Sequence, residues 1–168
     1  MNNIILTGFM GSGKTSTGIR LSRRLQCPFV DTDRLIEQET GKKIPRIFAE
    51  EGEAYFRDLE TKTLKKLAEG RERRIISTGG GLPVRPQNRP LLRALGTVVY
   101  LCVQPGTVYE RLRGDTGRPL LQCEDPAARI REMMAAREDA YREAAHVIIQ
   151  ADGMTFEEII KEIEERIR

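Results

Sequence analysis

The feature that most constrains this chain is the run GFMGSGKT at residues 8–15, because it matches the pattern GxxxxGK[ST]. It stands between a β-rich run, residues 3–6, and a stretch of helical period over about residues 15–25. Glycines let a backbone approach phosphate oxygens closely, and a helix start adds partial positive charge. The motif therefore predicts an ATP or GTP site in which Lys14 reaches the β and γ phosphates and the Thr15 hydroxyl ligates Mg²⁺. The alternative is a glycine turn capped by Thr15, and the flanking strand and helix argue against it.

Short β-rich runs alternate with longer stretches of helical period along the chain. Because each expected strand is followed by a helix-like stretch, the strands are expected to run parallel in one sheet. The pattern therefore predicts an α/β fold. The five expected strands are residues 3–6, 27–30, 75–77, 97–103 and 146–150.

Two departures from simple alternation predict structure around a ligand. A long helical block at about residues 33–70 follows the second strand. It predicts a lobe beside the carboxyl edge of the sheet, where open α/β folds bind ligands. Further on, Gly114, Gly117 and Pro119 interrupt a helical pattern. We interpret this segment as a lid that carries Arg118.

Composition limits the classes of protein to be considered. The chain has 168 residues, which suits one domain over residues 1–168. Its formal net charge of +3 comes from basic residues interleaved with acids, so a nucleic-acid partner is not expected. We find no apolar run long enough for a membrane span and no secretory signal, so a cytoplasmic protein is expected. The three cysteines form no CxxC pair, which argues against a disulfide framework or a zinc site.

Asp31 and Asp33 stand two residues apart at the end of the second expected strand. Strand geometry with a period of two would send both carboxylates to one face, toward the phosphate loop. One could hold the water shell of a metal, and the other could accept a hydrogen bond from an attacking hydroxyl. The alternative is that Asp33 only caps a helix over residues 34–40 and Asp31 is solvated.

Arg57 and Glu60 are spaced i, i+3 on a helix expected over about residues 53–67. The guanidinium could bind a substrate carboxylate through two parallel hydrogen bonds. Glu60 could orient that guanidinium or accept a hydrogen bond from a substrate hydroxyl. On these residues alone, an exposed helical salt bridge is the better interpretation.

Gly79, Gly80 and Gly81 follow the third expected strand directly. Three glycines leave bare backbone with N–H donors against which a substrate can lie, and this interpretation is favoured over a simple turn. The third strand ends without an acidic residue, which leaves Asp31 as the better carboxylate for a metal.

Three arginines remain as candidates. Arg118 in the segment GRPLL could close on the transferring phosphate, because phosphoryl transfer depends mostly on charge stabilisation. Taken singly, Arg111, Arg118 and Arg137 would each be interpreted as surface residues.

Taken together, these segments resemble shikimate kinases over nearly the whole chain. The resemblance rests on GFMGSGKT, DTD at residues 31–33, FRDLE at residues 56–60, the triple glycine, RPLL from Arg118, and AAR ending at Arg137. It implies a monomeric P-loop kinase with a three-layer α/β/α fold of the nucleoside-monophosphate-kinase-like type. The sheet would have five parallel strands in the order 2-3-1-4-5, with a substrate-binding lobe at about residues 33–61 and a lid at about residues 113–124.

The resemblance also implies an activity and a nucleotide site. Shikimate kinases transfer the γ-phosphoryl group of ATP to the 3-hydroxyl of shikimate, a step toward chorismate and the aromatic amino acids. Thr15 would ligate Mg²⁺ and Asp31 would reach the metal through water. Arg111 would stack on adenine, Arg118 would be the lid arginine on the phosphates, and Met154 would border adenine through its backbone. The ATP phosphates would be wrapped by Gly11, Ser12, Gly13, Lys14, Thr15 and Ser16.

On the acceptor side, the resemblance assigns Asp33 to the reacting hydroxyl. Arg57 and Arg137 would grip the shikimate carboxylate, and Glu60 would support Arg57. Backbone contacts would come from Gly79, Gly80 and Gly81. The expected catalytic residues are thus Asp33, Lys14 and Arg118, and the expected partners are the small molecules ATP and shikimate, with no nucleic acid and no membrane.

Two alternatives stay open. Another small-molecule P-loop kinase, acting on gluconate or on a nucleoside monophosphate, would share the phosphate loop but not an arginine grip for a carboxylate. A nucleotide-dependent switch would bind ATP and phosphorylate nothing. Release of ADP that depends on an added acceptor separates the kinases from the switch.

Overall fold

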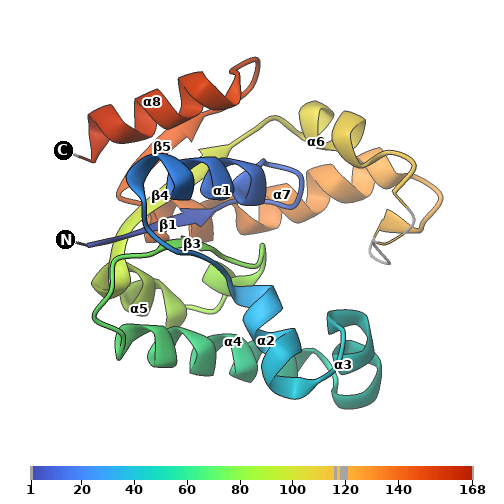
Figure 1. The fold of residues 1–168 in the computed structure, drawn as a ribbon. Helices are drawn as coiled ribbons and strands as arrows, with labels where there is room; N and C mark the ends of the chain where they lie inside the picture. The colour runs from blue at the N-terminus through green and yellow to red at the C-terminus, as the bar shows by residue number, and fades with distance from the viewer. Residues whose placement is uncertain (1, 116, 118–120, 168) are drawn as a thin grey trace.

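One parallel sheet forms the centre of the fold in the computed structural model, which describes residues 2–115, 117 and 121–167. Its strands are β1 (Asn3–Thr7), β2 (Phe29–Asp31), β3 (Ile75–Ser77), β4 (Gly96–Cys102) and β5 (Val147–Gln150). Their order across the sheet is β2-β3-β1-β4-β5, and all four neighbouring pairs are parallel. The predicted α/β class and the strand order implied by the resemblance are therefore confirmed (Figure 1).

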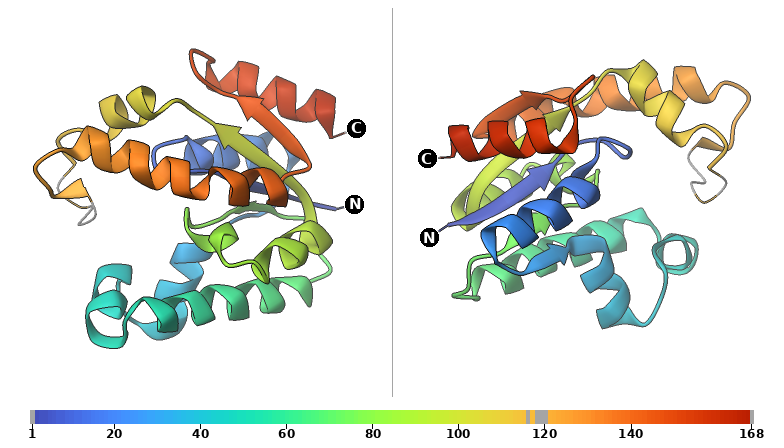
Figure 2. Two further views of the ribbon diagram at one scale, coloured as in Figure 1. Left: turned by 180° about the vertical axis from the view of Figure 1, so that it is seen from behind. Right: turned by 45° about the horizontal axis from the view of Figure 1, so that its top comes forward.

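Helices cover both faces of this sheet. They are α1 (Lys14–Leu25), α2 (Thr32–Thr40), α3 (Ile44–Glu51), α4 (Glu53–Ala68), α5 (Asn88–Leu95), α6 (Pro105–Leu112), α7 (Pro126–Ala144) and α8 (Phe156–Arg166), with a short 3₁₀ helix η1 (Leu82–Val84). α1 and α8 pack on one face, and α4, α5 and α7 pack on the other, as the rear view in Figure 2 shows.

The period of two along β1 explains these layers. Ile4 and Leu6 belong to the apolar cluster that includes side chains of α1 and α8 and extends to α7, whereas Ile5 belongs to the cluster under α4 and α5, which α7 joins through Ala144. Each of the three side chains is at most 1% exposed. Burial of an aliphatic side chain contributes about 1.5–3 kcal/mol, so a strand apolar on both faces is stable only between two helical layers.

The helical lobe has an apolar cluster of its own. Ile36 on α2, Ile47 on α3 and Phe56 on α4 pack together, separately from the two clusters of the sheet. The ring centroids of Phe48 and Phe56 lie 4.8 Å apart and contribute to the same contact. This packing holds α2 and α3 beside the first half of α4, on the side of the sheet away from the two termini (Figure 1).

The end of β2 differs from the prediction. The strand predicted at residues 27–30 runs from Phe29 to Asp31, and α2 begins immediately afterwards at Thr32. The reason is that Asp31 ends the ladder and also caps the helix, since its side chain accepts hydrogen bonds from the backbone N–H groups of Asp33 and Arg34.

The segment predicted as a lid, about residues 113–124, lies between α6 and α7. α6 ends at Leu112, and α7 begins at Pro126 with Asp125 as its N-cap. Arg118 lies outside the described residues. Within the described parts of the chain, no helix is both long enough and apolar enough to span a membrane.

Candidate active site

The phosphate loop connects β1 to α1 and is shaped by its glycines. Gly8, Gly11 and Gly13 have φ angles of 146°, 76° and 95°, a region that other residues rarely adopt. The loop curls so that Lys14 Nζ donates hydrogen bonds to the carbonyl oxygens of Gly8 at 2.8 Å and Phe9 at 2.9 Å. The ammonium group is therefore held inside the curve, at the start of α1, where an anion would also meet the partial positive charge of the helix.

A cleft of about 280 Å³ opens in front of this loop. It brings together residues from three turns at the carboxyl edge of the sheet. Its lining includes Met10, Gly11, Gly13, Lys14, Thr15 and Ser16 from the loop, Asp31 and Asp33 from the β2–α2 junction, and Ser77, Thr78, Gly79 and Gly80 after β3. Two stretches far apart in sequence thus face the candidate phosphate site, one bearing carboxylates and one bearing bare backbone.

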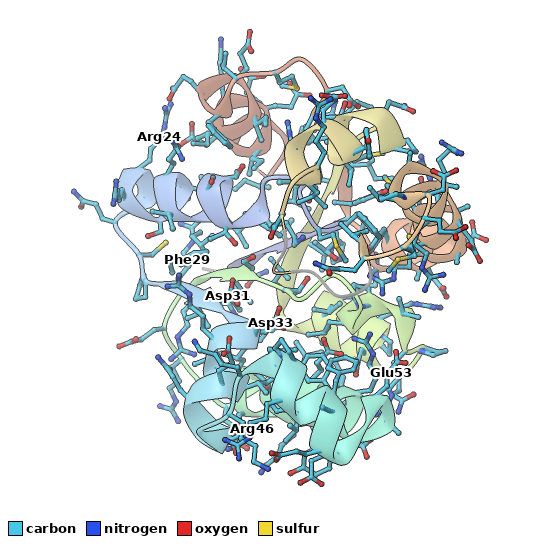
Figure 3. All side chains as sticks on the ribbon, turned by 90° about the vertical axis from the view of Figure 1, so that its right-hand side faces the viewer. Arg24, Phe29, Asp31, Asp33, Arg46 and Glu53 are labelled. Atoms are coloured by element: carbon cyan, nitrogen blue, oxygen red, sulfur yellow. The ribbon has the colours of Figure 1, made fainter. Side chains whose placement is uncertain are left out.

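Both aspartates lie at this cleft, although not for the reason expected from the sequence. Asp33 is in the first turn of α2 and not on a strand, so the argument from a period of two is wrong. The alternative in which Asp33 caps the helix is also wrong, because Asp31 is the N-cap. Helix geometry places the two side chains beside each other between α1 and the lobe, as Figure 3 shows.

The half-buried Asp33 and the fully buried Glu60 each direct a buried carboxyl oxygen toward Gly79. A Cβ atom on Gly79 would lie 2.6 Å from Asp33 Oδ1 and 3.1 Å from Glu60 Oε1. Among the described residues, neither of these two oxygens has a hydrogen-bond partner. Burial raises the pKa of Asp33 to about 6, helped by the nearby charge of Asp31. The two oxygens are therefore placed to accept hydrogen bonds from a ligand.

The ion pair of Arg57 and Glu60 is buried, so its interpretation as an exposed salt bridge is wrong. Arg57 Nη1 donates to Glu60 Oε2 at 2.8 Å, and the two side chains are 16% and 0% exposed. Burial raises the pKa of Glu60 to about 7 even though the Arg57 guanidinium opposes the shift. A Cβ atom on Gly81 would overlap the guanidinium of Arg57, so the triple glycine leaves room for this side chain.

Arg137 reaches the same region from α7. Arg57 and Arg137 line one cavity of about 290 Å³ together with Phe48, Glu53 and Met133. The Arg137 guanidinium lies 5.6 Å from the centroid of the Phe9 ring, next to the phosphate loop. Two guanidinium groups from distant parts of the chain thus face one cavity, an arrangement that suits a carboxylate.

Two residues expected to lie near adenine are described by the structure. Arg111 lies against the phosphate loop, whereas Met154 packs on an apolar cluster. Arg111 Nη1 donates to the Gly11 carbonyl oxygen at 2.8 Å. Met154 is half-buried and packs against the apolar cluster under α8. Phe156 is 38% exposed, and a Cβ on Gly13 would lie 3.7 Å from its ring and 4.0 Å from Arg111. No local pattern in the sequence indicates Phe156, because its neighbours depend on how α8 packs against α1.

We expect Gly79→Ala to destabilise the protein more than Gly80→Ala. The added methyl on Gly79 would press on Asp33 at 2.6 Å, whereas on Gly80 its nearest neighbour would be Arg137 at an ordinary contact of 3.5 Å. Overpacking of this kind lowers the free energy of unfolding by about 1–3 kcal/mol, and Gly80→Ala, the control, should lower it by less than about 1 kcal/mol. Urea unfolding of both variants measures the difference. Equal losses would show that Gly79 is not a close contact of Asp33.

The raised pKa values predict how stability depends on pH. Folding raises the pKa of Asp33 from 3.8 to about 6, so the folded state binds more protons than the unfolded state in this range. The stability contributed by this group is therefore complete below its unfolded pKa and is lost as pH rises through its folded pKa. We expect the free energy of unfolding of Asp33→Asn, relative to wild type, to rise between about pH 4 and about pH 7. A relative stability that is constant over this interval in urea titrations would contradict the shift.

Together the fold and the site define a P-loop phosphotransferase for a small acceptor, with a glycine-rich phosphate loop, a buried carboxylate beside it and an arginine-lined cavity next to both. A model of the shikimate kinase family matches residues 10–168. The chain belongs to the shikimate kinase family.

Relatives agree with this assignment over almost the full chain. The shikimate kinase of Symbiobacterium thermophilum is 45% identical over 168 residues, covering 99% of this chain and 96% of its own. The solved shikimate kinase from Acinetobacter baumannii in complex with shikimate has a TM-score of 0.92 and 38% identity, covering 98% of this chain and 92% of its own. A gluconokinase from Sinorhizobium meliloti 1021, with a TM-score of 0.64 and 18% identity, covers 99% of this chain and 91% of its own and shares the fold alone.

Proposed function

We propose that this chain transfers the γ-phosphoryl group of ATP to the 3-hydroxyl of shikimate, giving shikimate 3-phosphate and ADP. This reaction is a step in the biosynthesis of aromatic amino acids, and we place the enzyme in the cytoplasm as a monomer. The observation that carries the proposal is that Arg57 and Arg137 face one cavity while Asp33 lies at the phosphate loop. Shikimate has a carboxylate and a reactive hydroxyl, the two groups such a site would bind. The shikimate complex of the Acinetobacter relative supports this choice of acceptor.

On the nucleotide side, the loop backbone and Lys14 would bind the phosphates of ATP. Thr15 and Asp31 line the same cleft and offer hard oxygen ligands, so the donor set fits Mg²⁺. Thr15 would hold the ion directly, and Asp31 would hold it through water, because one of its oxygens already accepts from α2. Bound Mg²⁺ would neutralise negative charge on the phosphate oxygens.

On the acceptor side, Asp33 would accept a hydrogen bond from the 3-hydroxyl and align it for in-line attack. With its pKa at about 6, the Asp33 carboxyl is mostly ionised at neutral pH and can accept this proton. Arg57 and Arg137 would bind the shikimate carboxylate, with Glu60 holding Arg57 in place. The backbone of Gly79, Gly80 and Gly81 would border the ring of the substrate, with the N–H of Gly79 already donated to Thr32 Oγ1.

Arginines at the nucleotide would complete the site. Arg111 lies against Gly11, and with Phe156 it flanks the outer side of the loop, so we place adenine near these two side chains. Arg118 would close over the phosphates and stabilise the charge of the transition state. We assign Met154 only a bordering role, through its backbone.

A coupled ADP assay with Mg-ATP tests the proposal. The acceptor panel contains shikimate, quinate, gluconate and nucleoside monophosphates, with a reaction lacking any acceptor as the control. We expect strong ADP release with shikimate only. Release at the same rate without an acceptor would indicate an ATPase, and release with gluconate or a nucleotide alone would indicate another kinase of the same fold.

A further inference from the structure

Tyr141 is a buried side chain to which neither the sequence motifs nor the proposed mechanism gives a role. It lies on α7, four residues after Arg137, so the two side chains share one face of the helix. It is 1% exposed, and its hydroxyl donates a hydrogen bond of 2.6 Å to the carbonyl oxygen of Gly80. A buried hydroxyl needs a hydrogen-bond partner, and here the half-buried backbone of Gly80 supplies it.

Gly80 lies between the two halves of the site. A Cβ atom on Gly80 would lie 3.5 Å from Arg137 Nη1 and 3.6 Å from both Gly8 O and Met10 N of the phosphate loop. The backbone of Gly80 is therefore in near contact with the phosphate loop on one side and with Arg137 on the other. A shift of this glycine would change the distance between the candidate carboxylate grip and the phosphates.

The surroundings of Tyr141 fit a fixed donor. Its ring packs on Tyr100, with the two centroids 5.1 Å apart and the planes tilted by 35°. Burial raises the pKa of Tyr141, so the phenol keeps its proton, and the neighbouring Arg137 charge opposes this shift. The hydroxyl is thus placed to hold the Gly80 carbonyl while lying close to the Arg137 guanidinium.

We propose that Tyr141 is a positioning residue for the acceptor: its hydrogen bond to Gly80 sets where Arg137 lies relative to the phosphate loop, and so sets the affinity for the substrate carboxylate. This inference rests on the proposed function, because it assumes an acceptor that Arg137 binds. It assigns no contact between Tyr141 and substrate. Other backbone hydrogen bonds of this loop do not involve Tyr141: the N–H of Gly79 donates to Thr32 Oγ1 at 3.0 Å, and the carbonyl oxygen of Gly79 accepts from Leu82 N–H at 3.1 Å.

Tyr141→Phe tests the inference because it removes one hydroxyl and keeps the ring. We expect KM for shikimate to rise about tenfold while KM for ATP stays within about twofold and kcat falls by less than about threefold. The matched control is Tyr100→Phe, which loses the hydroxyl of a buried ring that is bonded to Glu138 at 2.7 Å; in the described part of the chain this hydroxyl has no hydrogen bond to Gly80. This control should leave both KM values within about twofold of wild type.

Calorimetric titration of shikimate onto both variants gives the same comparison without turnover. An unchanged KM and dissociation constant in Tyr141→Phe would overturn the inference, and so would an equal rise in Tyr100→Phe, which would indicate general loss of packing. Thermal unfolding of both variants checks that they are folded. Wild-type turnover of shikimate tests the proposed function, whereas the ratio between the two variants tests Tyr141, so the two proposals can fail separately.

Discussion

Asp33→Asn is expected to lower kcat by about a thousandfold, the largest effect in this enzyme, while KM for shikimate and for ATP changes by less than about threefold. The Asp33 carboxylate lies at the cleft of the phosphate loop, and its buried Oδ1 has no hydrogen-bond partner among the described residues. Asparagine keeps the size of the side chain and can still bond to the hydroxyl, but it cannot take the proton. The loss therefore falls on the chemical step and not on binding.

Steady-state kinetics with each substrate varied in turn measure this effect. The matched control is Asp139→Asn, an exposed position on α7 that removes the same charge. The variant protein should also be folded and more stable than wild type near neutral pH, because it no longer buries a charge. An unchanged kcat with raised KM for ATP would assign Asp33 to nucleotide binding and contradict its role at the hydroxyl.

Arg137→Ala is expected to raise KM for shikimate by about a hundredfold, with a smaller fall in kcat. A guanidinium paired with a carboxylate makes two charge-assisted hydrogen bonds, each worth about 1.5–3 kcal/mol, and most of this is present in both the ground state and the transition state. KM for ATP should stay within about threefold of wild type. Substrate-velocity curves for each substrate provide the measurement.

Two comparisons sharpen this test. Arg57→Ala should raise KM for shikimate similarly, but it should also lower the melting temperature, because Glu60 at 0% exposure loses its partner. The amide of shikimate, which carries no charge, should bind the wild type weakly and lose little further affinity in Arg137→Ala. If the charged and neutral acceptors lose affinity equally in this variant, Arg137 does not bind the carboxylate.

Much of the fold could be predicted because its signals are local. The glycines and Lys14 of the phosphate loop, the strand at residues 75–77 and the alternation of strands with helices are all short patterns in the sequence. The boundary at Asp31 could not be read this way. One residue there both pairs with β3 and caps α2, and only the folded chain shows which role sets the boundary.

Less of the candidate site could be predicted from the sequence, because its geometry depends on tertiary packing. Arg57 and Glu60 have the spacing of an ordinary surface ion pair, and their burial arises only when α4 packs beside Gly79 and Gly81. The need for glycine at position 79 follows from Asp33 and Glu60 meeting there, which no local pattern encodes. Tyr141 could not be assigned a role for the same reason, since its partner is a backbone carbonyl on another element.

A crystal structure with shikimate and a non-hydrolysable ATP analogue would show directly whether the two substrates bind side by side for phosphoryl transfer. We expect the triphosphate on the backbone of residues 8–15, the shikimate carboxylate between Arg57 and Arg137, and the 3-hydroxyl oxygen within about 3.5 Å of the γ phosphorus and hydrogen-bonded to Asp33. A carboxylate bound away from both arginines, or a hydroxyl too far from the γ phosphorus for direct transfer, would contradict it.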